Sequence, residues 1–515
     1  MRVDFVGHAT LLVRHGELSL LSDPWWSGPA YRDQWYPWPL PVPEQYDLSR
    51  LDAVYISHSH EDHLHAPTLR ALLQHAPSAL AIIPLRHDTQ MRDYLARIGF
   101  KRIKELASGT PWTLRKSRIN ASVIDSSRAV NDRRVNAARL APSCQGDSLR
   151  LTLLTHIDDS LLAVEQPGGD VLLNLNDALH SSRRELIHEY CRVLRGRFPR
   201  IDYLFCGFGG ASYFPNCVHV PGKDDLAVAR ARELYFLYNF ALIADQLRPK
   251  NAFPFAAHFV LPDEQNWWMS ALRLRMDAPS VMLRSLAPNT STEFHDLRPG
   301  DYVENGAVHA APFTRPDPPE LARQAVLERY GAPPERPMID PAAFDDLVAA
   351  IRARLAERPD LPNLDAAIVL SDYPLQVIRI RVASNRTFVE PIEASAVPEL
   401  GAQLVVETRS DLIRSTLRSA FGKDLISIGY GGQFRLRSAA DLAGSPHDRI
   451  LQLLSPVQPR WRQHLRDRPL RTLRYLIGDP SMRYAVTRRV LRRTRTLPNE
   501  PAPYDIRDWV AVPES

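Results

Sequence analysis

A short cluster of histidines and acidic residues constrains this chain more than any other feature. The cluster, Ser57-His58-Ser59-His60-Glu61-Asp62-His63, directly follows an apolar segment at 53–56 that is typical of a buried strand. In an extended segment residues i and i+2 point the same way, so His58 and His60 can bind one metal ion together. The following turn directs Asp62 and His63 toward a second ion. The sequence therefore predicts two metal ions that share and activate one water molecule, the alternative being a solvated polar loop.

The spacing His-x-His-x-Asp-His resembles the signature of the metallo-β-lactamase fold superfamily. The resemblance implies an α/β fold, an αββα sandwich, in which a third histidine, a later aspartate and a last histidine complete the site. The matching positions here are His156, Asp177 and His258. The resemblance thus implies two ligand sets bridged by Asp177: His58, His60 and His156, and Asp62, His63 and His258. Asp62 and Asp177 are also the candidate catalytic carboxylates.

Each later position keeps an alternative interpretation. His156 is alternatively an ordinary strand histidine, because Asp158 and Asp159 offer rival carboxylates. Asp177 is alternatively a cap at a strand-to-helix junction, and His258 a pocket residue. We expect structural roles for the remaining nearby histidines, and Asp23 is a candidate for orienting a ligand. Those histidines are His8, His65 and His180.

Three further stretches carry a narrower likeness: residues 21–25, 205–215 and 253–257, with Asn266 beyond. They resemble the lactamase-like part of the CMP-N-acetylneuraminate hydroxylase family, over roughly the first 290 residues. In that family a Rieske domain is expected to deliver electrons. Cys217-Val218-His219 starts a Rieske-type motif, but no later cysteine completes it. Oxygen chemistry in this chain would need a separate electron donor.

Two enzymatic interpretations follow from the ligand set. Zinc or manganese would activate water to hydrolyse a phosphodiester, lactone or amide, whereas iron would bind and reduce dioxygen. Two divalent ions against Asp62, Asp177 and a bridging hydroxide leave about one positive charge, which favours an anionic small-molecule substrate. Hydrolysis ranks narrowly first because it needs no electron donor. A diiron monooxygenase with a reductase partner is the alternative, and a non-catalytic binding module is the third hypothesis.

The rest of the chain suggests three regions: a catalytic domain at 1–290, a proline-rich connection at 291–341 and a smaller C-terminal α+β domain at 342–515. The last domain should contain a helix at 344–356 and four strands, at 367–370, 377–382, 403–407 and 425–428. Its end, 460–496, holds twelve arginines, which favours solvated helix faces over contact with an anionic surface. The glycines at 207–210 and 429–432 fit no nucleotide-binding motif and suggest tight turns.

Composition sets the remaining expectations. The 515 residues carry a formal charge of +5, which does not by itself indicate a nucleic-acid partner. No apolar run approaches the ~20 residues of a membrane span, and the N-terminus does not look like a secretory signal. We therefore expect a cytoplasmic protein. Four scattered cysteines indicate reduced core residues rather than disulfides.

Overall fold

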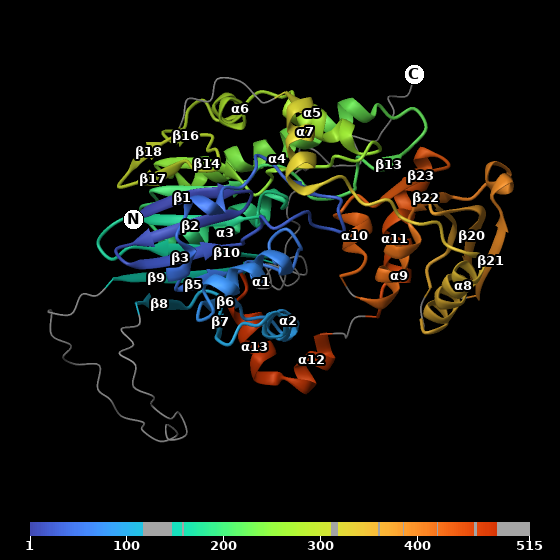
Figure 1. Ribbon diagram of the computed structural model, residues 1–515, viewed down its shortest axis with the longest axis horizontal. Helices are drawn as coiled ribbons and strands as arrows, with labels where there is room; N and C mark the ends of the chain where they lie inside the picture. The colour runs from blue at the N-terminus through green and yellow to red at the C-terminus, as the bar shows by residue number, and fades with distance from the viewer. Residues whose placement is uncertain are drawn as a thin grey trace, which may run out of the picture.

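The computed structural model describes residues 1–116, 147–156, 159–310, 318–358, 361–384, 386–419, 421–457 and 461–480. Figure 1 shows two neighbouring units, a larger one that begins at the N-terminus and a smaller C-terminal one. Among the described residues no helix is both long and apolar enough to cross a bilayer.

Two sheets form the centre of the larger unit. The first has the order β18-β17-β1-β2-β3-β5-β6-β7 and the second β16-β14-β12-β11-β10-β9-β8. The strands of the first sheet are β1 (Arg2–Gly7), β2 (Thr10–His15), β3 (Leu18–Ser22), β5 (Ala53–Tyr55), β6 (Leu80–Pro84), β7 (Ile103–Leu106), β17 (Tyr302–Glu304) and β18 (Ala307–His309). Those of the second are β8 (Pro111–Arg115), β9 (Ser148–His156), β10 (Asp159–Glu165), β11 (Val171–Asn176), β12 (Tyr203–Gly207), β14 (Asn251–Phe255) and β16 (Glu293–Phe294). A short pair, β4 (Tyr36–Pro37) and β15 (Phe259–Val260), lies outside both sheets.

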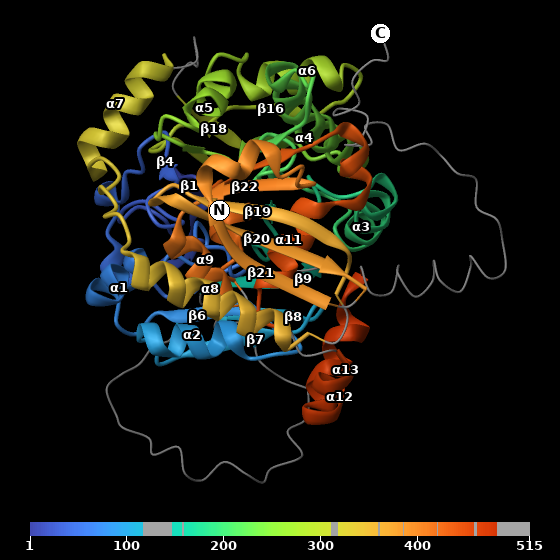
Figure 2. The same ribbon diagram turned by 90° about the vertical axis from the view of Figure 1, so that its right-hand side faces the viewer.

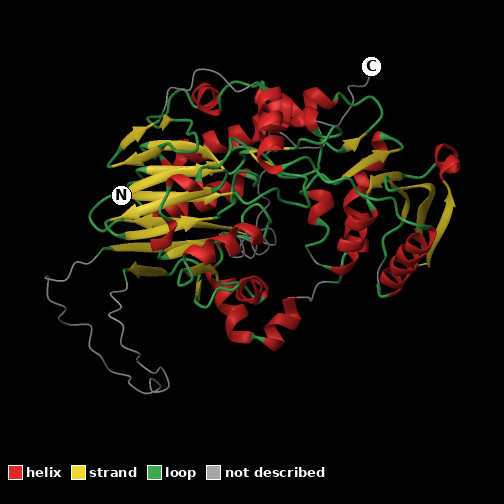
Figure 3. Cartoon of the chain, viewed as in Figure 1, coloured by secondary structure: helices red, strands yellow, loops and turns green. Residues whose placement is uncertain are grey.

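Helices cover the outer faces of these sheets. In β9, Leu149, Leu151 and Leu153 face the core between the sheets, whereas Leu154 faces the outer helices, as the two-residue period of a strand dictates. The first sheet is covered by α1 (Ala66–His75) and α2 (Gln90–Ile98), and the second by α3 (Arg184–Arg197), α4 (Asp225–Leu247) and α6 (Pro279–Leu286). This confirms the predicted αββα sandwich, which Figure 3 shows in cross-section.

A third sheet organises the C-terminal unit (Figure 2). Its order is β13-β23-β22-β19-β20-β21. The strands are β13 (Val218–His219), β19 (Leu364–Leu370), β20 (Tyr373–Ala383), β21 (Arg386–Glu393), β22 (Leu404–Thr408) and β23 (Gly432–Leu436). The helices of this part are α8 (Pro341–Ala356), α9 (Ser410–Arg418), α10 (Asp424–Ser427) and α11 (Pro446–Leu454). The strand expected at 425–428 is wrong: these residues lie in and beside α10, because a segment of four residues is too short to show a decisive periodicity.

The boundaries of the two units differ from those that we expected. β17 and β18 belong to the first sheet, so the larger unit extends past residue 290 to His309, and β13 of that unit pairs with β23. Helix α5 (Trp267–Leu274) lies before the expected connection, and helix α7 (Pro319–Tyr330) lies within it. Because β13 of the larger unit pairs with β23 of the C-terminal unit, the two units form one packed body.

The glycine-rich segments pack at this junction. A Cβ on Gly431 would lie 2.4 Å from Leu412 Cδ1, and one on Gly210 would lie 2.2 Å from Phe236 Cε2. The Tyr430 hydroxyl donates to the Gly210 carbonyl at 3.0 Å. None of the glycines at 207–210 or 429–432 has positive φ. Close packing against neighbouring side chains, rather than a tight turn, therefore explains Gly210 and Gly431.

Two short helices of the arginine-rich end return to the larger unit. α12 (Trp461–Asp467) and α13 (Pro469–Gly478) contact β7 and the loop before α2, and Figure 1 shows them below these elements. Arg471 Nη1 donates to Glu105 Oε2 at 2.9 Å, and its Nε donates to the Asp88 carbonyl at 2.9 Å. At least this arginine is engaged within the chain, while 481–496 lies outside the described residues.

Candidate metal centre

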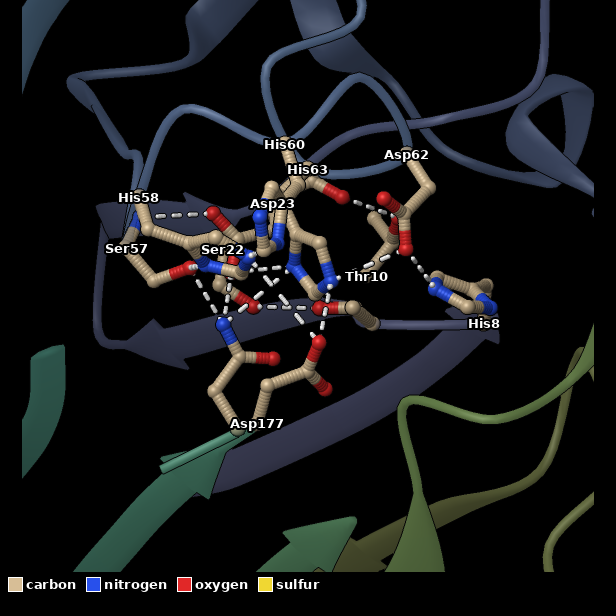
Figure 4. A network of polar contacts seen from close by, with 12 residues as sticks. His8, Thr10, Ser22, Asp23, Ser57, His58, His60, Asp62, His63 and Asp177 are labelled. Atoms are coloured by element: carbon tan, nitrogen blue, oxygen red, sulfur yellow. Dashed lines mark hydrogen bonds and ion pairs between the residues drawn. The ribbon is translucent and has the colours of Figure 1, made fainter. Parts of the chain in front are cut away.

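The predicted cluster lies in the loop after β5, at the carboxyl end of that strand (Figure 4). His58 Nε2 lies 2.8 Å from His60 Nδ1, and the rings of His58 and His63 are 4.2 Å apart. Burial, with the neighbouring His63 and His60, lowers the pKa of His58 well below its usual value. His58 is therefore neutral, which is the form of imidazole that coordinates a metal.

Three groups of side chains bring candidate ligand atoms within 4.8 Å of one another. They are His58, His60 and Asp159; His58, His63 and Asp177; and His8, Asp62 and His63. Five of the seven predicted ligands thus come together, and two residues join them from outside the predicted set. We take the first and third groups as the two halves of a dinuclear centre, with the second between them.

Asp159, rather than His156, lies in the group that contains His58 and His60. The two residues face each other across the β9–β10 pair, at the end of the hairpin next to the cluster. Asp159 Oδ1 lies 3.4 Å from His58 Nδ1. His156 Nε2 instead contacts Ser182 Oγ at 2.8 Å, and its ring packs edge-on against Tyr190. The rival carboxylate of the sequence analysis therefore lies in the position expected of the third histidine; Asp158 is outside the described residues.

His8, not His258, joins Asp62 and His63. His8 Nε2 lies 3.0 Å from Asp62 Oδ2, and His63 Nε2 lies 3.0 Å from the same oxygen. The His258 ring lies between Phe5 and Phe208 and lines an apolar cavity of about 120 Å³. Burial, together with His8 and Arg273, lowers the pKa of His258 to about 3. The alternative interpretation of His258 as a pocket residue matches this placement.

Sequence reasoning had given His8 a structural role. The signal that could have identified it is its position directly after β1, at the same end of the sheet as the loop after β5.

Asp177 lies between the two halves, as a bridging carboxylate would. It follows β11, and its Oδ2 is 3.2 Å from His63 Nε2 and 3.9 Å from His58 Nε2. Burial alone would raise the pKa of Asp177, but the charge and hydrogen bond of His63 lower it below its usual value. The same balance, with His8 added, lowers the pKa of Asp62. Both carboxylates are therefore ionised and able to bind a cation.

Other side chains hold the ligands in place. Asp23 Oδ2 lies 3.3 Å from His63 Nδ1 and accepts a 2.6 Å hydrogen bond from Asn176 Nδ2, while Asp23 Oδ1 accepts from the Ser57 amide at 2.8 Å. This is the orienting role expected of Asp23, since a ligating histidine usually uses its second nitrogen in this way. His65 contacts Thr68 and caps α1, and His180 contacts the Gly209 carbonyl.

The residues present fit a pair of metal ions. Asp159 Oδ1 and Asp177 Oδ1 are buried oxygens without a hydrogen-bond partner among the described residues. Such atoms are rare in proteins because leaving them unpaired costs ~1–3 kcal/mol each, more for charged groups. Cations bound between the carboxylates and the imidazoles would satisfy them. The donor set of nitrogen and oxygen atoms suits zinc, manganese and iron.

Comparison with known proteins agrees with the fold of the larger unit. Residues 2–165 match the model of the Beta-lactamase superfamily domain. The cytidine monophosphate-N-acetylneuraminic acid hydroxylase of Danio rerio is 30% identical over 267 residues, covering 50% of this chain and 38% of that protein. The mouse hydroxylase is 25% identical over 322 residues, covering 60% and 48% respectively.

Two further matches complete the comparison. A Mycobacterium tuberculosis protein named for a Rieske 2Fe-2S iron-sulfur centre is 28% identical over 224 residues, covering 43% of this chain and 37% of that protein. Igni18, a metallo hydrolase of Ignicoccus hospitalis, has a similar chain with 14% identity and a TM-score of 0.35, covering 59% and 97%. This chain spans less than half the length of the curated relatives described above. The superfamily resemblance is confirmed for residues 2–165, which match the β-lactamase superfamily domain.

Proposed function

We propose that this chain is a dinuclear iron hydroxylase that acts on an anionic small molecule. The reaction takes a substrate C–H bond, dioxygen, two electrons and two protons, and yields a hydroxyl group and water. The electrons come from a separate donor, for which an iron–sulfur protein is the expected class. The ranking of the sequence analysis, hydrolysis first, is thus reversed, and the placement of Asp159 is the observation that carries the change.

The placement of Asp159 changes the donor set of one half of the centre. His58, His60 and Asp159 form a two-histidine, one-carboxylate group, the set that non-haem iron oxygenases use with open positions for substrate and dioxygen. A three-histidine group would instead resemble the catalytic zinc sites that activate water. Iron in this site would supply one-electron and dioxygen chemistry, which zinc lacks.

The chain's own residues would orient the ligands and exclude bulk water. His8, His58, Asp62 and His63 are buried, so the site is largely dry. Asp23 orients His63 through Nδ1, and Asp177 lies within reach of both halves. His60, on the cluster's exposed side, is only partly buried, so substrate would approach there.

The sequence relatives support the same choice. Two of those described above are named hydroxylases, and a third is named for a Rieske centre. In this chain the described cysteines, Cys191, Cys206 and Cys217, are buried and lie in no metal-binding group of the described residues. An electron donor outside the 515 residues is therefore part of the proposal.

Hydrolysis with zinc or manganese is the second candidate function. The observation in its favour is that His156 pairs directly with Asp159 at the end of the hairpin. If the His156 side chain turned away from Ser182 toward His58 and His60, the three histidines would form one ligand group.

Metal content tests the two candidates. We expect about two iron atoms per chain in protein purified without added metal, with an oxo-bridged absorption band in air. Asp159→Asn should lower the iron content, whereas His156→Ala, the matched control across the same strand pair, should retain it. Zinc or manganese in place of iron, lost in His156→Ala and kept in Asp159→Asn, would instead establish the hydrolytic site.

A further inference from the structure

We infer that the substrate binds in a cleft between the two units, and that Lys423 and Arg86 bind its anionic group. The inference deepens the proposed function and rests on it for the reaction. The cleft has a volume of about 560 Å³, within the usual range for small-molecule sites. Ser59 and His60 of the metal cluster line it, so a ligand in the cleft lies beside the candidate metal centre.

Several segments far apart in sequence form the walls, and three of them carry the basic and imidazole side chains. The loop between β6 and α2 contributes Arg86 and His87, the start of α10 contributes Lys423, and α12 contributes His464. The rings of His87 and His464 lie 4.5 Å apart, edge to face, which joins the returning C-terminal helices to the rim. Residues of the C-terminal unit and of the arginine-rich end thus line the same cleft, because neither sheet of the larger unit encloses it alone.

The cleft holds two cations, Arg86 and Lys423, against three carboxylates, so an anion is favoured only where those cations lie. Each of its three carboxylates already has a partner: Asp88 Oδ1 accepts from the Gln90 amide at 3.0 Å, Asp448 Oδ1 accepts from the Tyr213 hydroxyl at 2.5 Å, and Asp424 is also engaged. By contrast, the Lys423 ammonium has no hydrogen bond or ion pair within the described part of the chain. An ammonium of this kind attracts a carboxylate or phosphate.

The remaining lining selects a hydroxyl-bearing ligand. Ser59, Ser212 and Ser427 line the cleft with the imidazoles, so donors and acceptors are distributed over both walls. Phe421, 46% exposed, adds an apolar surface. Such a lining fits a small organic anion with several hydroxyl groups rather than an apolar substrate.

Saturation-transfer NMR on the full-length, metal-loaded chain tests the inference with three probes of similar size: glucose 6-phosphate, glucuronate and glucose. We expect the charged sugars to bind and glucose to bind more weakly. Stronger binding of glucose 6-phosphate would identify a phosphate site, and stronger binding of glucuronate a carboxylate site; both support the inference. Equal transfer to all three, or none to any, would overturn it.

Variants locate the binding. Lys423→Gln and Arg86→Gln should each weaken binding of the preferred anion about five-fold, whereas Lys423→Arg and the exposed Lys101→Gln should not. Metal content should stay at the parent level in every variant. If Lys423→Gln binds the anion as tightly as the parent does, the cleft is not the substrate site, even if the protein contains iron. Zinc with Lys423-dependent binding would overturn the hydroxylase and leave the cleft standing.

Discussion

The Tyr31 hydroxyl donates a 2.6 Å hydrogen bond to Asp62 Oδ1, and both side chains are buried. Tyr31 packs in the core that joins the C-terminal unit to the sandwich, whereas Asp62 belongs to the metal cluster. The bond therefore couples the position of a candidate metal ligand to the packing of the second unit.

The backbone around Tyr31 shows what this contact requires. Tyr31, Arg32 and Asp33 have φ angles of 53°, 54° and 66°, a run of left-handed conformations that non-glycine residues seldom adopt. Arg32 Nη1 donates to Asp411 at 2.8 Å, and Asp33 accepts from Arg336 at 2.5 Å. Contacts with later parts of the chain thus hold residues 31–33 in a strained backbone conformation, and from it the Tyr31 side chain orients Asp62.

Removing the Tyr31 hydroxyl should weaken metal binding. In Tyr31→Phe we expect about a ten-fold loss of affinity for one of the two ions, because Asp62 loses its orienting donor. Competition titration with a chromogenic chelator measures both affinities. Tyr36→Phe is the matched control, since among the described residues its hydroxyl donates to the Gly331 carbonyl and not to a candidate ligand. Equal affinities in Tyr31→Phe and the parent would show that Asp62 needs no such donor.

Gly431→Ala should destabilise the junction between the units. The added Cβ would meet Leu412 Cδ1, the Leu425 carbonyl at 2.6 Å and Gln34 Oε1 at 2.5 Å, so backbone must move. We expect the free energy of unfolding to fall by ~1–3 kcal/mol in urea denaturation. Gly196→Ala, in α3 with no heavy atom within 4 Å of the added Cβ, should instead raise it by ~0.5–1 kcal/mol. Equal effects would contradict the close-packing explanation.

His447 should make the C-terminal unit less stable in acid. Burial lowers the pKa of His447, nearby Asp448 offsets this only in part, and the ring stacks on Phe214. The unfolded chain then binds a proton that the folded chain refuses, so the free energy of unfolding falls as the pH drops below about 6.5. His447→Gln should flatten this fall between about pH 7 and 5, whereas the exposed His188→Gln should leave it unchanged. Thermal melts across that range measure the slopes, and parallel slopes in parent and His447→Gln would refute the assignment.

The sequence by itself determined the local part of the site. The order strand, histidine-rich loop, helix requires only neighbouring residues, because the i, i+2 geometry of extended backbone brings His58 and His60 together wherever that strand lies. The superfamily resemblance followed from the same short motif, and the fold it implied is confirmed. The ligand assignments themselves stay predictions.

Only the tertiary structure decided which distant residues complete the centre. His156 and Asp159 are three positions apart in the sequence, and strand pairing, not spacing, determines which side chain faces His58. His8 joins Asp62 because β1 and β5 end at the same edge of one sheet, and Lys423 reaches the cleft because residues 425–428 turn into a helix rather than a strand. These contacts depend on how whole sheets and units pack, which a local pattern of residue types does not encode.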